Sequence, residues 1–393
     1  MKVTLFASAM LLSGSLLWKK DQLILFFQQE NAIVAQHPVI SSPSAADNTR
    51  IQVALLLDTS NSMDGLIDQA KSRLWNIINT LTTLKYKGKT TTIEIALYEY
   101  GNDYIPAESG YIRKVTSFTT DLDLISEKLF ALTTNGGSEF CGAAISAAVD
   151  ALEWGRNESD LKLIYIAGNE PFTQGEISYA TSARKAVKNN IYVNTIFCGN
   201  KQEGISTKWK DGADLGQGKY FNINADKKVV FIETPYDRQI QKCNEKINQT
   251  YIAYGAQGAS KKMNQVQQDL NANAISAANS AERFVSKSKS VYKNGSWDIV
   301  DYAKDDTTVL KKISKKDLPA ELQNKTTAEM QTWIKAKSQE RDTLQKEMAS
   351  LGKQRQKFID EAMKKTNHSD DLGAAISQSI IEQAMGKGYT AEK

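Results

Sequence analysis

The segment ALLLDTSNSMDG, residues 54–65, joins a buried apolar run to three small oxygen-bearing side chains. Asp58, Ser60 and Ser62 stand at every second position, so one short loop carries a carboxylate and two hydroxyls. Oxygen ligands of this kind suit a hard cation such as Mg²⁺, which often retains water and needs only one or two carboxylates. The alternative is structural, because a Ser or Asp here can cap the helix that follows or favour its dipole. The combination of all three residues favours the metal site.

Several other chemistries are excluded or unsupported by the sequence. Its two histidines, His37 and His368, exclude a three-histidine zinc site and leave a Ser-His-Asp triad without support. No GxxxxGK[ST] sequence occurs, so a P-loop nucleotide site is excluded. The net charge of +4 is dispersed along the chain and does not indicate a protein that binds nucleic acid.

Strands and helices alternate along the chain around the oxygen-rich loop. Apolar patterns predict strands at 51–58, 92–100, 161–168 and 190–199, and a short edge strand at 218–222. Helical spacing predicts helices at 63–84, 122–132, 142–154 and 178–189. This alternation predicts an α/β fold in which helices cover both faces of a doubly wound, mostly parallel sheet. Ligands bind such sheets at the carboxyl ends of the strands, where Asp58 lies.

The order strand, DxSxS, helix resembles the metal-ion-dependent adhesion site of von Willebrand factor type A domains, and the resemblance covers about residues 51–230. It implies a Rossmann-like fold that binds a divalent cation, Mg²⁺ or else Mn²⁺ or Ca²⁺, through Asp58, Ser60 and Ser62. It also implies that an Asp or Glu carboxylate of a protein partner completes the coordination of the metal.

The resemblance implies a second contribution from a loop that precedes a helix, NGGSEFCGAAI at residues 135–145. Ser138 takes the place of the family's threonine, so a hydroxyl is kept. Glu139 beside it can add a negative charge. A glycine turn with a helix-capping residue explains the same sequence, and it is compatible with metal binding.

The third contribution in the family is an aspartate at the end of a later strand, and here the sequence departs from the pattern. In YIAGNEPF, residues 165–172, Gly168 falls at the position of that aspartate. Asn169 and Glu170 are candidates to reach the metal directly or through water. Otherwise the site lacks this ligand and binds its cation weakly.

Two of the three cysteines are expected near the same edge of the sheet. Cys141 precedes a predicted helix, and Cys198 ends a predicted strand. A disulfide between them would suit an exported protein, whereas two unpaired buried cysteines are the alternative. Cys243 would remain single in either case.

The N-terminal residues 1–36 have the pattern of an export signal. Lys2 precedes an apolar stretch, and Lys19 and Lys20 follow it. A cleaved signal peptide and a retained N-terminal anchor both remain open, and a membrane is a partner only in the second case. Both export the rest of the chain to the periplasm, the cell surface or the outside. The polar, proline-containing residues 37–50 are expected to be a linker.

The sequence predicts a von Willebrand type A-like domain at 51–250 and a mostly α-helical C-terminal domain at 251–393. Residues 270–286 read as one helix, and 291–302 as a small hairpin or a packed loop. The longest predicted helix, 327–365, roughly follows a heptad pattern, which the charged residues Lys337, Arg341 and Arg355 interrupt. This favours a helix packed on one neighbour over a long coiled coil.

The expected function is divalent-cation-dependent binding of another protein in the cell envelope or outside the cell, without catalysis. The first alternative is a metal-free structural scaffold. The second is a hydrolase in which the metal activates water and Glu139 or Glu170 acts as the base. The scarcity of histidine and the hydroxyl-rich ligand set argue against the hydrolase.

Overall fold

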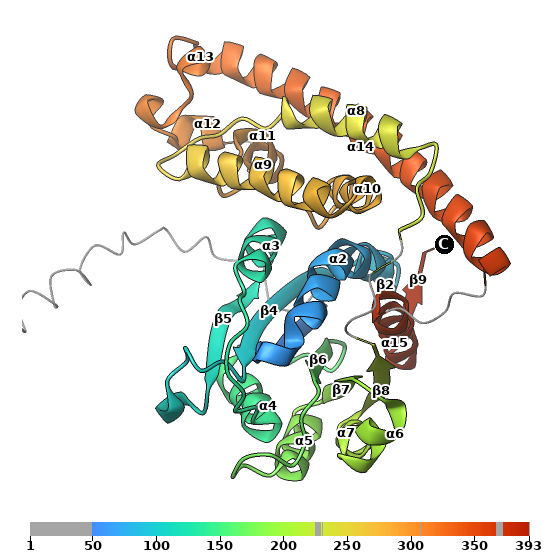
Figure 1. Ribbon diagram of the computed structural model, residues 1–393. Helices are drawn as coiled ribbons and strands as arrows, with labels where there is room; N and C mark the ends of the chain where they lie inside the picture. Colours follow the sequence, from blue (N-terminus) through green and yellow to red (C-terminus); the bar gives the residue numbers. More distant parts are fainter. Residues whose placement is uncertain (1–48, 225–228, 230, 307, 367–371, 393) are drawn as a thin grey trace, which may run out of the picture. The chain divides into compact units, whose positions relative to one another are not determined.

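The computed structural model describes residues 49–392 except 225–228, 230, 307 and 367–371 (Figure 1). Residues 48–393 form one compact unit. The predicted signal peptide or anchor at 1–36, and nearly all of the predicted linker at 37–50, lie outside the described residues. Among the helices that are described, none is both long and apolar enough to span a membrane.

The α/β part is built on a six-stranded sheet with Asp58 at the end of a central strand. In spatial order its strands are β5 (Ile112–Thr119), β4 (Thr92–Tyr100), β1 (Arg50–Asp58), β6 (Leu161–Gly168), β7 (Ile191–Cys198) and β8 (Gln217–Ile223). β1 pairs in parallel with β4 and β6, and β5 alone runs antiparallel to its neighbour. The predicted mostly parallel α/β sheet is confirmed.

Alternation along β1 explains why both faces of the sheet are covered. Val53 and Leu57 point into one hydrophobic core, and Ala54 and Leu56 point into the other, because successive strand residues face opposite sides. The first core lies under α2 (Asp64–Leu81) and α3 (Leu122–Phe130). The second lies under α4 (Cys141–Ala151), α5 (Tyr179–Lys188) and α7 (Trp209–Leu215), with the short α6 (Lys201–Ser206) beside α7 (Figure 1).

A second, small sheet was not predicted and joins distant parts of the chain. Its strands are β3 (Lys89–Thr90), β2 (Leu84–Tyr86) and β9 (Tyr389–Ala391). β2 and β3 form a hairpin in which both turn residues, Lys87 and Gly88, have positive φ angles of 49° and 74°. Such turns usually contain Asn-Gly or Asp-Gly, so Lys-Gly is a weak sequence signal.

Beyond the sheet, the described residues within 237–366 are mostly helical. The helices are α8 (Asp237–Asn248), α9 (Gly258–Ile275), α10 (Ala277–Ser286), α11 (Ile299–Asp305), α12 (Val309–Lys312), α13 (Ala320–Gln323) and α14 (Thr327–Thr366). The single helix predicted at 270–286 is wrong. Ser276 adopts extended backbone and its side chain accepts a hydrogen bond from the N–H of Asn279, so it ends α9 and caps α10.

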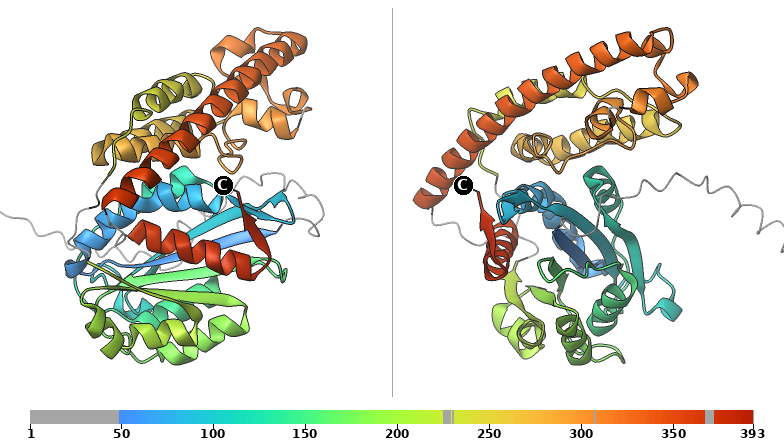
Figure 2. Two further views of the ribbon diagram at one scale, coloured as in Figure 1. Left: turned by 90° about the vertical axis from the view of Figure 1, so that its right-hand side faces the viewer. Right: turned by 180° about the vertical axis from the view of Figure 1, so that it is seen from behind.

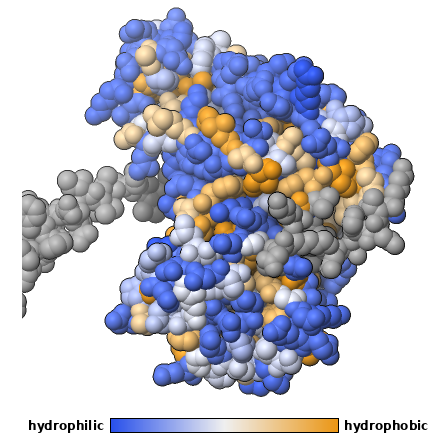
Figure 3. Space-filling view, viewed as in Figure 1, coloured by the Kyte–Doolittle hydropathy of each residue, from blue (hydrophilic) through white to orange (hydrophobic). Residues whose placement is uncertain are grey.

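Helix α9 has its polar side inward and an apolar side outward. Gln265 and Gln268 are fully buried. Met263, Val266 and Leu270 are exposed, and hydrophobic residues reach the surface in the region of α9 and α10 (Figure 3). The inward polar side is explained by what it faces, a buried network of charges.

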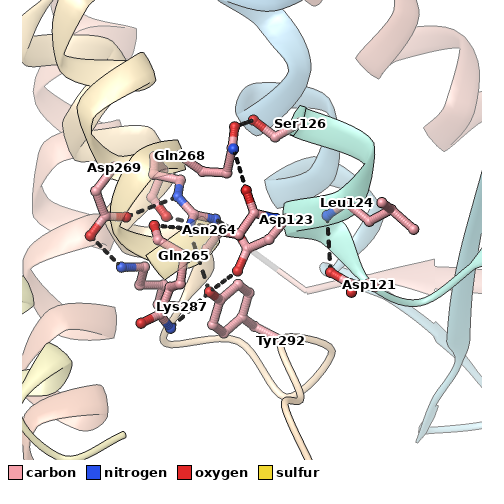
Figure 4. Close-up of polar contacts among 12 residues, drawn as sticks. Asp121, Asp123, Leu124, Ser126, Asn264, Gln265, Gln268, Asp269, Lys287 and Tyr292 are labelled. Atoms are coloured by element: carbon pink, nitrogen blue, oxygen red, sulfur yellow. Dashed lines mark hydrogen bonds and ion pairs between the residues drawn. The ribbon is translucent and has the colours of Figure 1, made fainter. Parts of the chain in front are cut away.

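This network ties α3 of the α/β part to α9 and α10 (Figure 4). Asp123 on α3 forms an ion pair with Arg283 at 2.6 Å and accepts a hydrogen bond from the hydroxyl of Tyr292 at 2.6 Å. Asp269 on α9 pairs with Lys287 at 2.6 Å. Burial opposes the charge of Asp269, but Lys287 and Arg283 lower its pKa to about 2. Charged groups thus replace part of the apolar core between the two parts of the chain.

The last helix and strand return to the α/β part (Figure 2). α15 (Leu372–Gly386) packs on α2, and β9 pairs with β2. The hydroxyl of Ser379 lies 2.6 Å from that of Tyr165 on β6, and the side-chain amide of Gln383 bonds that of Asn194 on β7. The helical residues 237–366 therefore lie, in sequence, between two segments that build the α/β part.

Candidate functional site

Three strand ends meet at one edge of the sheet. Asp58 ends β1 and is paired in register with Tyr100, the last residue of β4. On the other side Leu57 is paired with Ala167, so Gly168 at the end of β6 lies next to Asp58. Because these strands are parallel, their carboxyl ends form the edge at which ligands bind in open α/β sheets.

The DTSNS loop brings its three oxygen-bearing side chains together. The N–H of Ser60 donates to Oδ1 of Asp58 at 2.8 Å, and the hydroxyls of Ser60 and Ser62 lie 3.3 Å apart. Asp58 and Ser60 are buried, whereas Ser62 is exposed. The site therefore runs from a buried carboxylate to a hydroxyl at the surface.

The two serines do not act as helix caps. Ser60 precedes a short 3₁₀ turn at Asn61–Met63, and its side chain makes no capping hydrogen bond there. The residue before α2 is Met63, which has no capping side chain. Neither hydroxyl makes the helix-capping hydrogen bond that the structural alternative expects.

The loop after β6 closes one side of the site. The side-chain amide of Asn169 donates to the hydroxyl of Ser62 at 3.1 Å. Glu170 is half-buried, its charge acts on Asp58, and its backbone carbonyl accepts a hydrogen bond from the indole of Trp209 at 2.8 Å. The structure therefore brings both predicted candidates to the DTSNS loop.

The glycine-rich loop closes the opposite side. Its backbone is docked on the DTSNS loop, because the N–H of Asn61 donates to the carbonyl of Gly136 at 3.1 Å and that of Asn135 donates to the carbonyl of Thr59 at 2.9 Å. Ser138 follows in this loop and is half-buried. Glu139 is only 3 % exposed, and its Oε2 has no hydrogen-bond partner among the described residues.

Asp58 is held in an environment that disfavours its charge. Burial raises the pKa of Asp58 to about 7, and the charge of Glu170 adds to the rise. Hydrogen bonds from Ser60 and from the backbone N–H of Asn169 act in the opposite direction. Its Oδ2 atom nevertheless has no partner that meets hydrogen-bond geometry among the described residues. A buried, unpaired carboxylate oxygen is costly unless a proton or a cation neutralises it.

The side chain of Tyr100 occupies the space beside Gly168, where a side chain at position 168 would otherwise lie. A Cβ atom at position 168 would lie 2.6 Å from the hydroxyl oxygen of Tyr100 and 2.9 Å from Oδ2 of Asp58. The Tyr100 hydroxyl donates to the carbonyl of Ala167 at 2.8 Å. The position at which the resemblance implies an aspartate therefore cannot hold a side chain while Tyr100 is in place.

The disulfide considered between Cys141 and Cys198 is not formed. Both cysteines are buried free thiols, as is Cys243. The thiol of Cys141 lies 3.6 Å from the Tyr100 hydroxyl, and that of Cys198 is 4.0 Å from the carbonyl of Ile196. Burial raises the pKa of Cys141 and of Cys198 well above that of an ordinary thiol, so both are inert packing residues.

Two residues that support the site were missed in the sequence analysis. Tyr100 fills the space beside Gly168. The side chain of Asn102 donates to the carbonyls of Thr59 at 3.3 Å and Thr133 at 2.8 Å, which holds two of the loops together. The available signal was their position, because both stand at or just after the end of a predicted strand, on the same edge as Asp58.

The donor set fits a hard divalent cation. Two buried carboxylates with unpaired oxygens, Asp58 and Glu139, lie with the hydroxyls of Ser60 and Ser62 at one edge. Within the described parts of the chain, no three or more His, Cys, Asp and Glu side chains are grouped so as to hold a metal. A cation here would therefore depend on hydroxyl ligands as well as carboxylates.

Comparison with known families agrees with the fold. Residues 52–211 match the von Willebrand factor type A domain family, so the α/β part of the chain is a domain of this family. Such domains are generally interaction or scaffold modules. The match identifies the class of domain.

Solved structures with a similar fold include BatB from Bacteroides thetaiotaomicron, with 14 % identity over 44 % of this chain and 90 % of that one, at a TM-score of 0.33. The VWA domain of SpRpn10 has 16 % identity over 44 % and 87 % of the two chains, also at 0.33. Proximal thread matrix protein 1 from the mussel byssus, with a zinc-occupied MIDAS motif, has 15 % identity over 46 % and 43 %, at 0.33. No curated protein matches the sequence.

Proposed function

We propose that this protein binds another protein in a manner that depends on a divalent cation at the edge formed by the DTSNS loop. The cation is Mg²⁺, or else Mn²⁺ or Ca²⁺. Its ligands, direct or through water, are Asp58, Ser60, Ser62 and Ser138, and further contributions come from the three residues Glu139, Asn169 and Glu170. A carboxylate of the partner completes the coordination.

The observation that carries this proposal is the state of Asp58. Its Oδ2 is buried and unpaired beside two hydroxyls that cap no helix. A cation bound there would supply the positive charge that this carboxylate lacks and would attract a further oxygen ligand. Ser62, which is exposed, marks the side from which a partner can approach.

The proposed place of action is the cell envelope or the exterior. The support is the sequence pattern of residues 1–36, a lysine followed by an apolar stretch and two further lysines. If this segment is retained, the protein is also anchored to a membrane.

A metal-free scaffold is the second candidate. It is favoured by Gly168, since the third loop brings no aspartate to the site. The two candidates differ in one measurable property, because a ligand that binds the folded state raises its thermal stability and a scaffold gains nothing from the cation.

The experiment compares melting temperatures of the full chain in EDTA and in excess Mg²⁺ or Mn²⁺. We expect the cation to raise the melting temperature of the wild type and not that of Asp58→Ala. Asp68→Ala is the matched control, because Asp68 is an exposed carboxylate on α2, outside the DTSNS loop. If neither cation changed the melting temperature of the wild type, the result would support the metal-free scaffold.

A further inference from the structure

The loops that surround the proposed cation site are strongly acidic. They comprise residues 58–64, 101–111, 131–140 and 168–178, and we call them the site loops. Asp58 and Glu139 are buried in them. The exposed or half-buried acidic residues are Asp64, Asp103, Glu108, Glu170 and Glu176. The site loops contain no lysine, arginine or histidine, although the whole chain carries a net charge of +4.

Neighbouring basic residues do not cancel this charge. Arg113, which follows the second site loop, forms an ion pair with the buried Glu99. Lys201 and Lys208 belong to the segment after β7, outside the site loops, and the same segment carries Glu203. Among the described residues, the negative charge of the site loops is therefore largely uncompensated.

A second observation concerns two buried carboxylate oxygens in the site loops. Oδ2 of Asp58 and Oε2 of Glu139 are buried and lack hydrogen-bond partners among the described residues. The two side chains approach each other at Gly101, where a Cβ atom would lie 2.9 Å from Oδ1 of Asp58 and 2.6 Å from Cγ of Glu139. A proton or a positively charged ligand can neutralise such oxygens, and one divalent cation would serve both.

One divalent cation offsets only two of these charges. Asp64, Asp103 and Glu108 are exposed on the loops around the proposed metal site, and like charges brought together at an interface oppose the binding of a partner carboxylate. Basic residues on either side of that carboxylate would reverse the sign of this interaction. Two unit charges 4 Å apart in water interact by about 1 kcal/mol, so a few such pairs decide between partners.

We infer that the partner presents its carboxylate within a basic segment, with lysine or arginine on both sides of the Asp or Glu that reaches the metal. This inference rests on the proposed function, and it names the chemistry of the partner for the same site. The acidic site loops attract and orient the segment, and the cation fixes its carboxylate.

Two exposed apolar side chains on the site loops add contact area to this surface. Tyr104 is 80 % exposed, beside Asp103, and Ile177 is 48 % exposed, beside Glu176. Tyrosines are common at the centres of protein interfaces. The site loops thus offer exposed carboxylates and two exposed apolar side chains beside the proposed cation site.

The test uses the full chain and three synthetic peptides of equal length, measured by fluorescence anisotropy in Mg²⁺ and in EDTA. The first peptide has one Asp flanked by lysines, the second has the same Asp flanked by glutamates, and the third has Asn in place of Asp between lysines. We expect the lysine-flanked Asp peptide to bind on the order of tenfold more tightly than the glutamate-flanked one. The preference should shrink as salt is added.

A charge variant shows whether the site loops cause the preference. Asp103→Asn, Glu108→Gln and Glu176→Gln combined should remove most of the preference for lysine and leave the dependence on Mg²⁺. The matched control combines Glu158→Gln, Glu321→Gln and Glu361→Gln, three exposed acidic residues outside the site loops that change the net charge equally. This control should keep the preference.

The possible results separate the inference from the proposed function. The inference is overturned if both Asp peptides bind with equal affinity in a Mg²⁺-dependent manner. It is also overturned if the site-loop variant keeps the same preference for the lysine-flanked peptide as the control variant. Either result leaves the proposed function intact. Equal binding of the lysine-flanked Asn and Asp peptides in Mg²⁺, unchanged by EDTA, overturns the cation bridge but supports a basic partner. Failure of all three peptides to bind overturns both.

Discussion

Asp58 gives the first prediction at the scale of single residues. Burial raises its pKa to about 7, against about 3.9 for an ordinary aspartate. Between these values the folded, cation-free protein holds a proton that the unfolded chain releases, so stability falls as pH rises from about 4 to 7 and then levels off. Asp58→Asn cannot ionise. We expect it to lose this dependence and to exceed the wild type by about 4 kcal/mol above pH 7.

Urea unfolding in EDTA at several pH values checks this prediction. The cation should reverse the order, because it binds the ionised Asp58 and stabilises the wild type alone. A wild-type stability that runs parallel to that of Asp58→Asn across the window would show that Asp58 ionises normally.

Gly168 gives the second prediction. Gly168→Ala places a methyl group against the Tyr100 hydroxyl, and overpacking of this kind costs about 1–3 kcal/mol. Tyr100→Phe removes the hydroxyl and should recover part of that loss, so a double-mutant cycle measures the coupling. Additive effects of the two substitutions would contradict the contact.

Asp58, Ser60 and Ser62 could be predicted as a group because their spacing follows directly after a buried strand. Their arrangement on one short loop is local, so the sequence pattern contains it. Tyr100 and Gly168 lie far apart in the chain, and their contact follows from the pairing of β4 and β6 with β1. A contact between residues so far apart cannot be predicted from the local sequence pattern.

At the scale of elements, α14 shows how charged residues can occupy a core-facing row. Met330, Ile334, Lys337, Arg341 and Leu344 recur every three or four residues, and Arg341 is fully buried. Its guanidinium pairs with Asp298 at 2.5 Å and with Asp301 at 2.7 Å. The apparent interruption of the heptad is thus part of the packed face.

Removing one partner of such a buried pair should be costly. Arg341→Leu leaves Asp298 buried without its counter-charge, and we expect a loss of about 3–5 kcal/mol in the free energy of unfolding. Lys337→Leu is the control on the same row, because Lys337 is half-buried and pairs with the surface residue Glu340, so it should change stability by less than about 1 kcal/mol. If Arg341→Leu and Lys337→Leu lowered stability equally, the result would contradict a stabilising ion pair between Arg341 and Asp298.

Helix and strand positions in the α/β part were predictable because each element has one strong period. The helical part was harder, since its inward faces are mixed. The break at Ser276 has no proline or glycine to mark it, and α9 buries glutamines while it exposes Met263. Partners on α3 and α10, distant in sequence, decide which side of α9 is buried.

At the scale of the whole molecule, the C-terminal helix completes the α/β part. Ile380 on α15 is fully buried against the sheet and α2, whereas Met385 on the same helix is 61 % exposed. Ile380→Ala should therefore lower the free energy of unfolding by about 2–5 kcal/mol, and Met385→Ala should be nearly neutral.

Chemical denaturation followed by tryptophan fluorescence measures both variants. Trp75 on α2 is fully buried in the same core as Ile380, so it contributes to the fluorescence change when this core unfolds. If Ile380→Ala left that transition unchanged, α15 would not be packed as described.

The most direct test of the central claim is calorimetric titration of the full chain with Mg²⁺ and Mn²⁺, beside Asp58→Ala and Ser62→Ala. The account predicts saturable binding by the wild type, none by Asp58→Ala and weakened binding by Ser62→Ala. Binding that Asp58→Ala retains in full would contradict it, because the cation would then lie somewhere other than the DTSNS loop.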